Sequence, residues 1–421
     1  MLAELVLVTR LLGLVSGEYP VSIYVDPRVA RVELLRNGVP VRTVVGPPWQ
    51  ALLDFGRELV PQDLTAIAYD ASGAEIARDT QLVNLPRPSA EAAIDLRRDG
   101  EALRATVRWQ HIGSERVRDI TWKLDGKSFG KGEASLLLPR VEPRRLHVVE
   151  AEVAFWDGVV ARRERVFGGF FTEEVPSELT GAVVRLRERN DEGSSDPGNC
   201  FRIDGRPVAA AGVEKGEAMV VFIRDPDPRA ARKALRGKGA GKTNLDADIR
   251  IMWPTATSIV EKDRRTVSNL FEHSQAIEGT KMGTQALLTG RGGPKKNEQR
   301  YADAVAVSGV YAALGARRRA VVLVVGANPD KSKQTPAVVR RYLERIGVPF
   351  RVWSLIGAKK EVTNVWGEVV DISSAAKLQR ATEELQQELD RQRVAWLPLE
   401  PLAALRVEAA EGCGLIPVAR P

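Results

Sequence analysis

The rhythm of hydrophobic and polar positions changes once along the chain, close to residue 218. Before that point, short runs alternate apolar and polar residues, and turn residues interrupt them about every 8 to 12 positions, which predicts the strands of β-sandwiches. After it, wholly apolar runs alternate with segments of helical periodicity. Such runs predict buried parallel strands joined by crossover helices. We therefore expect a multidomain chain in which all-β modules precede an α/β domain.

Two tandem β-sandwiches of the immunoglobulin-like type are expected, at residues 1–86 and 88–171. In the first, Asn37-Gly38 separates two alternating runs, and this dipeptide supplies the positive φ angles of a two-residue hairpin turn. Asp125-Gly126 repeats the pattern in the second. The prolines of Leu85-Pro86-Arg87-Pro88 cannot donate to a strand ladder and favour an extended linker between the two modules.

The rest of the chain divides into a short connecting part and a large domain. Residues 172–217 are expected to form a short β segment leading into the next domain. Residues 218–421 are expected to form a doubly wound, Rossmann-like α/β domain with a C-terminal helix and tail. Its helices are predicted near residues 299–314, 336–346 and 374–394, where apolar residues recur every three to four positions.

The composition of the chain does not alter the expected domains, but it argues against some classes of function. Lys and Arg number 62 against 55 Asp and Glu, so the net charge of +7 permits acidic partners without marking a nucleic-acid binder. The 421 residues include only three histidines, which lie far apart, and no acid, base and nucleophile show a spacing that suggests convergence. We therefore predict a protein without enzymatic activity and without a catalytic residue.

Two features bear on compartment. Cys200 and Cys413 permit a disulfide that would tie the C-terminal tail to the third β segment, and two unpaired thiols are equally compatible with the sequence. No apolar run of 18 residues is present, so no membrane span is expected. Sandwich modules of this type favour export to the periplasm or the cell exterior, whereas the chain as written carries no export signal. The compartment is therefore left open.

Three stretches carry a resemblance to a known family. Within residues 218–355, segments 220–225 (VVFIRD), 301–326 and 335–355 are similar to the first strand, the helix and fourth strand, and the next helix and strand of a von Willebrand factor A-like domain. With tandem immunoglobulin-like modules in front, the chain resembles the von Willebrand factor A-related (VWFA-related) proteins common in acidobacteria. This resemblance implies a bacterial adhesion or protein-interaction role carried by the A-like domain.

The resemblance also implies where a metal would bind. Domains of this family hold a divalent ion, in the MIDAS motif, through Asp-x-Ser-x-Ser after the first strand, a Thr in a later loop and an Asp after the fourth strand. Here the first motif reads Asp225, Asp227 and Arg229, and Pro294 stands near the expected Thr. The site is therefore degenerate: no cofactor is firmly expected, and Mg²⁺ or Ca²⁺ would have Asp225 and Asp227 as ligands.

Basic residues gather in the three loops that a parallel sheet would bring to one edge. Our hypothesis is that this basic loop face, instead of a coordinated ion, receives an acidic protein partner; a generally solvated charged surface is the alternative explanation. The residues concerned are Arg229, Arg232, Lys233, Arg236, Lys238, Lys242, Arg291, Lys295, Lys296, Arg300, Lys331 and Lys333.

The function predicted from the sequence is therefore recognition. The A-like domain would bind its acidic partner while the two sandwiches serve as spacers, as in adhesive or scaffolding chains. The alternative is a binder of an anionic polymer, nucleic acid or acidic polysaccharide, through the same loops. The identity of the partner and the oligomeric state do not follow from the sequence.

Overall fold

The computed structural model divides into two compact units, Met1–Pro86 with Glu178–Pro421, and Arg87–Ser177. It describes residues 5–7, 14–85, 90–99, 102–111, 116–141, 146–156, 160–168, 180–187, 200–210, 212–235, 243–257, 270–293, 299–314, 317–325, 329–357, 360–410 and 412–419.

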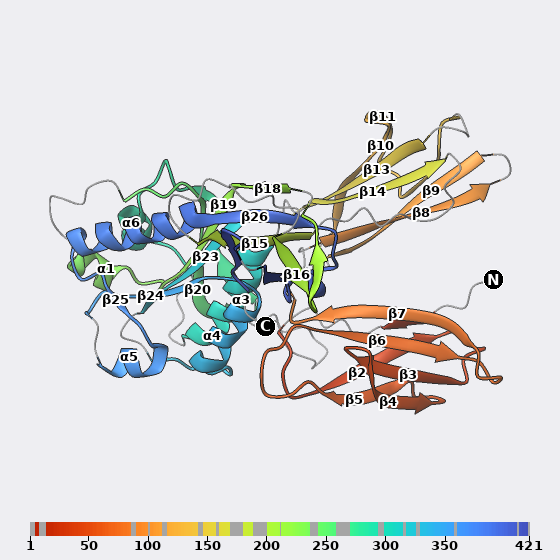
Figure 1. Ribbon diagram of the computed structural model, residues 1–421, viewed down its shortest axis with the longest axis horizontal. Coiled ribbons are helices and arrows are strands. Elements are labelled where there is room, and N and C mark those ends of the chain that lie inside the picture. Colours follow the sequence, from red (N-terminus) through yellow and green to blue (C-terminus); the bar gives the residue numbers. More distant parts are fainter. Residues whose placement is uncertain are drawn as a thin grey trace. The chain divides into compact units, whose positions relative to one another are not determined.

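The first β-sandwich lies within the first of these units (Figure 1). One sheet has the order β1-β2-β5 and the other the order β4-β3-β6-β7, and the core between them includes Val21, Leu34 and Leu64. Asn37 and Gly38 form the β3–β4 turn with φ angles of 49° and 74°, as predicted. The strands are β1 Leu5–Leu7, β2 Glu18–Val25, β3 Arg31–Arg36, β4 Val39–Val45, β5 Gln50–Asp54, β6 Gln62–Tyr69 and β7 Glu75–Val83.

The second β-sandwich makes up the other unit. Its sheets have the orders β11-β10-β13-β14 and β12-β9-β8, and Trp122 and Phe155 are fully buried between them. Asp125 and Gly126 form the predicted β10–β11 turn, with φ angles of 49° and 77°. The strands are β8 Ala90–Asp99, β9 Ala102–His111, β10 Val117–Leu124, β11 Lys127–Lys131, β12 Ser135–Leu137, β13 Leu146–Phe155 and β14 Val160–Gly168. The prediction of two sandwich modules is thus confirmed by the strand pairing.

A mixed sheet forms the centre of the remaining chain. The order of its strands is β21-β20-β19-β23-β24-β25. The five strands from β20 to β25 in this order run parallel, and β21 is antiparallel at one edge. Strand β22 also pairs with β20, in the antiparallel sense. Strand β19 is apolar and buried throughout, because both faces of the sheet are covered. The strands are β19 Ala218–Ile223, β20 Asp248–Thr257, β21 Leu270–His273, β22 Ile277–Glu278, β23 Arg318–Val325, β24 Phe350–Ser354 and β25 Val370–Asp371.

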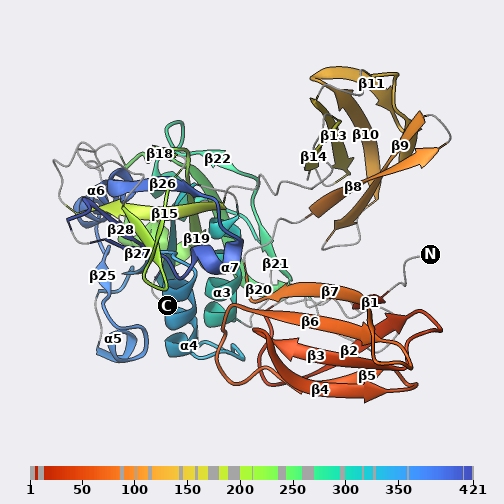
Figure 2. The ribbon, with the colours of Figure 1, turned by 45° about the vertical axis from the view of Figure 1, so that its right-hand side comes forward.

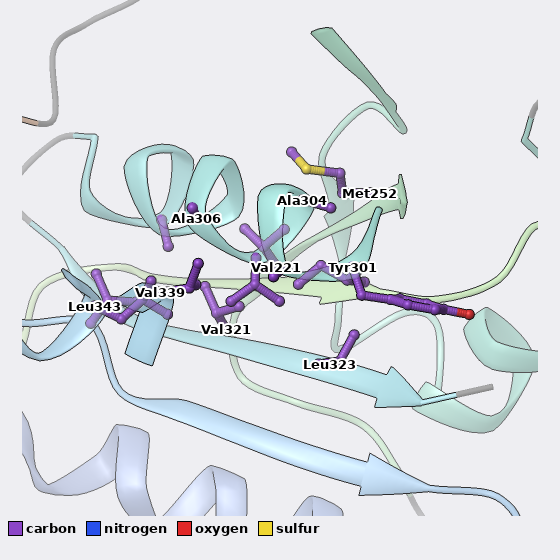
Figure 3. Close-up of a cluster of buried hydrophobic side chains, with 14 of the residues drawn as sticks. Val221, Met252, Tyr301, Ala304, Ala306, Val321, Leu323, Val339 and Leu343 are labelled. Carbon is purple, nitrogen blue, oxygen red and sulfur yellow. The ribbon is translucent and has the colours of Figure 1, made fainter. Parts of the chain in front are cut away.

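Helices cover both faces of this sheet. Helices α3 and α4 pack on one face, where Val221, Leu323 and Leu343 share a core (Figure 3). Helices α1, α2 and α6 pack on the other, around Phe222 and Trp353. The bounds are α1 Arg229–Ala234, α2 Thr284–Thr289, α3 Tyr301–Ala313, α4 Pro336–Arg345, α5 Lys360–Trp366, α6 Ala375–Arg391 and α7 Pro401–Ala404. None of the helices in the described ranges is long and apolar enough to cross a membrane.

The short β segment before this domain pairs with the C-terminal tail (Figure 2). Two small sheets, β18-β26-β15-β28 and β17-β16-β27, mix strands from both ends of the α/β part. Cys200 and Cys413 are joined by a disulfide in their common core, which decides between the two alternatives left open by the sequence. The strands are β15 Thr180–Leu186, β16 Phe201–Ile203, β17 Arg206–Val208, β18 Gly212–Glu214, β26 Gln392–Leu397, β27 Glu408–Ala409 and β28 Leu415–Pro417.

The first sandwich packs against helix α4, which the expectation of a spacer did not foresee. Leu59, in the loop between β5 and β6, is fully buried in the α3–α4 core. Arg341 donates two hydrogen bonds to the Glu58 carboxylate, at 2.9 and 2.5 Å, and lowers the pKa of that group. The buried Tyr342 hydroxyl donates to the backbone oxygen of Asn84 at 3.1 Å. The first sandwich, which keeps a core of its own, therefore also contributes to the core of the α/β part.

A pH-dependent contact lies at the start of α6. Lys377 Nζ lies 2.5 Å from Asp371 Oδ2, and mainly this contact lowers the pKa of Asp371 from 3.8 to about 2. Because the folded-state pKa is depressed, the carboxylate stabilises the fold above about pH 4, and this contribution is lost as the pH falls toward 2. The pair is partly exposed, so we expect Asp371→Asn to cost only about 1 kcal/mol at pH 7.

Thermal melts between pH 7 and pH 2.5 test this expectation. The difference between Asp371→Asn and the wild type should shrink steadily below pH 4, whereas Glu383→Gln, an exposed change on the same helix, should give no such trend. A difference that keeps its full size at pH 2.5 would show that the carboxylate charge does not supply the stability.

Candidate functional site

The carboxyl ends of the parallel strands form the candidate site. Counted from β19, the sheet order is 3-2-1-4-5-6, so the order reverses between β19 and β23. In doubly wound sheets ligands bind at such a switch point, outside the carboxyl ends of the strands. Arg224, directly after β19, is 4% exposed and ties this edge together by donating to Asp225 O at 2.8 Å and Gly290 O at 3.0 Å. Its burial lowers the pKa of the guanidinium.

Asp225, the first acid after β19, is engaged by a side chain from within the fold. The Tyr301 hydroxyl donates a hydrogen bond to Asp225 Oδ1. Tyr301 is the first residue of α3 and is itself buried, with its hydroxyl turned away from the aliphatic side chains of the core (Figure 3). Helix α3 therefore places a neutral hydrogen-bond donor at one oxygen of this carboxylate.

Asp227, the second acid of the predicted metal motif, is held by Arg229. The Arg229 backbone N–H donates to Asp227 Oδ1 at 3.0 Å, and its side-chain Nε donates to Oδ2 at 2.6 Å. These contacts, led by the side-chain hydrogen bond, lower the pKa of Asp227. Arg229 itself remains 89% exposed. A cation of the chain thus already neutralises this carboxylate.

Asp330 and Asp303 bind the loop after β23 to the start of α3. Asp330 Oδ1 accepts the Tyr301 N–H at 2.9 Å and the Ser332 N–H at 3.0 Å. The buried Asp303 accepts the backbone N–H groups of Lys333 and Gln334, both at 3.0 Å. Asp330, the carboxylate nearest the position of the family's fourth-strand Asp, therefore caps a helix.

This set of donors does not fit a divalent ion. Mg²⁺ prefers near-octahedral oxygen ligands, yet Asp225 and Asp227 are bound by Tyr301 and Arg229, and the two serines of the family motif are replaced. Within the described residues, no group of three or more His, Cys, Asp or Glu side chains is arranged to hold a metal. Instead, the chain's own side chains bind these carboxylates, through a neutral hydroxyl at Asp225 and a guanidinium at Asp227.

Metal titration tests this conclusion. We expect 5 mM Mg²⁺, Mn²⁺ or Ca²⁺, or an excess of EDTA, to leave the melting temperature unchanged, because only a ligand that binds the folded state stabilises it. Asp225→Asn should behave like the wild type in these titrations. A metal-induced rise of several degrees that Asp225→Asn abolishes would restore the predicted ion site.

The structure places seven of the twelve predicted basic residues. Arg232 lies on α1 and donates through Nε to Thr289 O at 2.8 Å, which joins α1 to α2. Arg300 is largely buried and donates to Asp303 at 2.8 Å through Nε, so its charge is used inside the fold. Five are exposed, and we call them the basic face: Arg229, Lys233, Arg291, Lys331 and Lys333. The other five lie outside the described residues: Arg236, Lys238, Lys242, Lys295 and Lys296.

Comparison with known proteins adds no identification. No family model matches the chain, and no curated protein matches it. Fibronectin(III)-like modules of CbhA from Clostridium thermocellum share 14% identity over 39% of this chain and 93% of theirs, with a TM-score of 0.17. The central fibronectin-III array of RIM-binding protein shares 13% identity over 50% and 81%, with a TM-score of 0.25.

One further solved structure shows how partial these likenesses are. A β-glycosidase from Bacteroides vulgatus shares 12% identity over 40% of this chain and 25% of its own, with a TM-score of 0.24. Scores this low carry no argument about fold or function. The assignment of the sandwiches therefore rests on the pairing of their own strands.

Sequence reasoning missed two residues of the site, Asp303 and Tyr301. The spacing of Arg300 and Asp303, three residues apart on a predicted helix, is a signal for an ion pair that would have removed Arg300 from the predicted surface. Tyr301 gave no such signal, because its partner Asp225 lies 76 residues earlier.

Proposed function

We propose that this chain is a non-enzymatic interaction protein whose α/β domain recognises an acidic protein surface through the basic face. The observation that carries the proposal is the exposure of five cations: Arg229 and Lys233 on α1, Arg291 after α2, and Lys331 and Lys333 after β23. Hydrogen bonds to the backbone hold two of these segments in place. Arg224 donates to Gly290 O after α2, and Asp303 and Asp330 accept backbone N–H groups of the segment after β23. Charges on preorganised loops lose little conformational freedom on binding, which favours affinity.

The same domain is proposed to be a divergent relative of the von Willebrand factor A-like domains. The strand order and the alternation of strands and helices from residue 218 onward support this, together with the sequence resemblance. In this interpretation, Tyr301 binds Asp225, which stands at the motif's Asp, and Arg229 binds Asp227, which replaces the motif's first Ser. Recognition would then depend on fixed cations instead of an ion shared with the partner.

An extracellular or periplasmic location is proposed as well. The disulfide between Cys200 and Cys413 supports it, because such bonds form and persist mainly in oxidising compartments. A count of free thiols in the denatured protein, taken directly from its native compartment, tests this. No reactive thiol is expected before reduction, and two reactive thiols before reduction would contradict the location.

Binding of an acidic polypeptide tests the central proposal. The full-length chain would be titrated into labelled poly-glutamate at low salt, with heparin and random-sequence duplex DNA as alternative probes. One variant carries four Gln substitutions in the basic face: Lys233→Gln, Arg291→Gln, Lys331→Gln and Lys333→Gln. A matched control carries four Gln substitutions at exposed cations elsewhere: Arg42→Gln, Lys127→Gln, Arg206→Gln and Arg380→Gln.

The expected result is selective loss in the basic-face variant. At about 0.5 kcal/mol for each exposed charge, four charges give about 2 kcal/mol, or about thirtyfold weaker binding of poly-glutamate. The control should retain wild-type affinity at the same salt concentration. Equal weakening of both variants would show that binding depends only on the net charge of the chain and would contradict a specific basic face. Much tighter binding of heparin or DNA, with a steep salt dependence, would favour the anionic-polymer alternative.

A further inference from the structure

The two ends of the α/β part lie on neighbouring strands. Strand β15, where the described chain resumes after the second sandwich, pairs antiparallel with β28, near the C-terminus. The Val418 N–H donates to Val183 O at 3.0 Å, and the Arg187 N–H donates to Gly414 O at 2.8 Å. The chain thus enters and leaves this part side by side, although more than 200 residues separate the two strands.

The disulfide closes the chain just inside these two strands. Cys200 and Cys413 are buried, and their Cα atoms lie 5.3 Å apart across a sequence separation of 213 residues. Phe201 and Val407 pack in the same core. The resulting covalent ring, residues 200–413, contains the whole mixed sheet, the helices on both of its faces and every residue of the basic face.

We propose that this ring is a mechanical bypass that keeps tension away from the recognition domain. A pull transmitted along the chain passes through β15, the disulfide and β28, because the bond offers a covalent path between the two sides. The points where the chain joins the ring cannot separate beyond the disulfide, so a pull along the chain cannot extend the backbone of residues 200–413 end to end. The segments that carry the basic face therefore stay within the closed ring while the chain is under load.

The size of the protected segment makes the effect measurable. A fully extended residue spans at most about 3.4 Å, so releasing a ring of 213 residues adds about 70 nm of contour length. While the disulfide is intact, none of this length can appear. Weakening of sheet contacts inside the ring would not release this contour length, because the covalent disulfide bond holds the two ends of the segment together.

Single-molecule pulling of the full-length chain tests the bypass. The protein would be held through fused handles that contain no thiols and stretched to full extension, first without a reductant and then after a reductant is added to molecules that have refolded. The intact chain should reach a total contour length about 70 nm shorter than that of the whole 421-residue chain. The reduced chain should gain that length, and Cys200→Ser with Cys413→Ser should match the reduced chain.

Two results would overturn the proposal. One is a total contour length before reduction that already equals that of the whole 421-residue chain, and the other is no gain of length after reduction. Because reduction acts on molecules that have already folded, the test holds even if the double Ser variant folds poorly. The outcome is also independent of poly-glutamate binding, so it can succeed or fail separately from the proposed function.

Discussion

Replacing Arg319 by Met is expected to lower the free energy of unfolding by about 3 kcal/mol, the largest effect of a polar substitution that we predict. Arg319, in β23, is buried, and it donates through Nε to Gly347 O and through Nη1 to Ala313 O, both at 3.0 Å. Ala313 is the last residue of α3, and Gly347 lies two residues after the end of α4. Leaving two buried acceptors without a donor costs about 1–3 kcal/mol each, and the added apolar contacts of Met offset part of it.

Burial has a measurable effect on Arg319 itself. Desolvation lowers the pKa of its guanidinium to about 10, and the charge is solvated by backbone carbonyls instead of by an acid.

Arg380→Met, at an exposed position on α6, provides the matched control for Arg319→Met and should change the free energy of unfolding by less than about 0.5 kcal/mol. Chemical denaturation of the three proteins measures the difference. A loss below 1 kcal/mol in Arg319→Met would show that the helix ends do not depend on this side chain.

Leu59→Ala is expected to cost about 3 kcal/mol and to loosen the first sandwich from the α/β part. Its side chain belongs to a loop of the sandwich, yet it is fully buried among residues of α3, α4 and the central sheet. Truncating a buried Leu costs about 2–5 kcal/mol, through lost burial and the cavity left behind. The ion pair of Glu58 with Arg341 is exposed and screened, so it cannot compensate.

Leu52→Ala supplies the control for this prediction, because Leu52 is 59% exposed on strand β5 of the same sandwich. Hydrogen exchange of α4 gives the direct readout. In Leu59→Ala, α4 should exchange faster around Tyr342, whose hydroxyl donates to Asn84 O in the folded protein. Unchanged exchange of α4, with a melting curve like that of Leu52→Ala, would mean that the sandwich is a free spacer, as the sequence suggested.

The parts of the fold that were predictable have local causes. Asn37-Gly38 and Asp125-Gly126 form hairpin turns because these residues tolerate positive φ angles wherever they occur. Helix α6 follows from apolar side chains at a spacing of three to four residues, which any amphipathic helix on a sheet must show. Strand β19 follows from an unbroken apolar run, which implies cover on both faces.

The parts that were not predictable depend on contacts between distant segments. Strand β15 pairs with β26 and β28, which begin more than 200 residues later, and three-residue strands such as β28 carry almost no periodic signal. Leu59 is one apolar residue in a loop, which gives no sign of the core that it joins. At the candidate site, the sequence predicted twelve basic residues at the sheet edge, of which the described structure shows five exposed, and only the fold showed that Arg300 is held by Asp303.

A hydrogen-exchange footprint of bound poly-glutamate on the full-length chain tests whether the basic face is the recognition surface. We predict slower exchange in three segments, residues 229–235, 290–293 and 329–334, which carry the exposed cations of the basic face. The effect should disappear in the basic-face variant and persist in the control variant. Protection that is concentrated elsewhere, or that is unchanged when the four cations are replaced, would contradict recognition at this edge of the sheet.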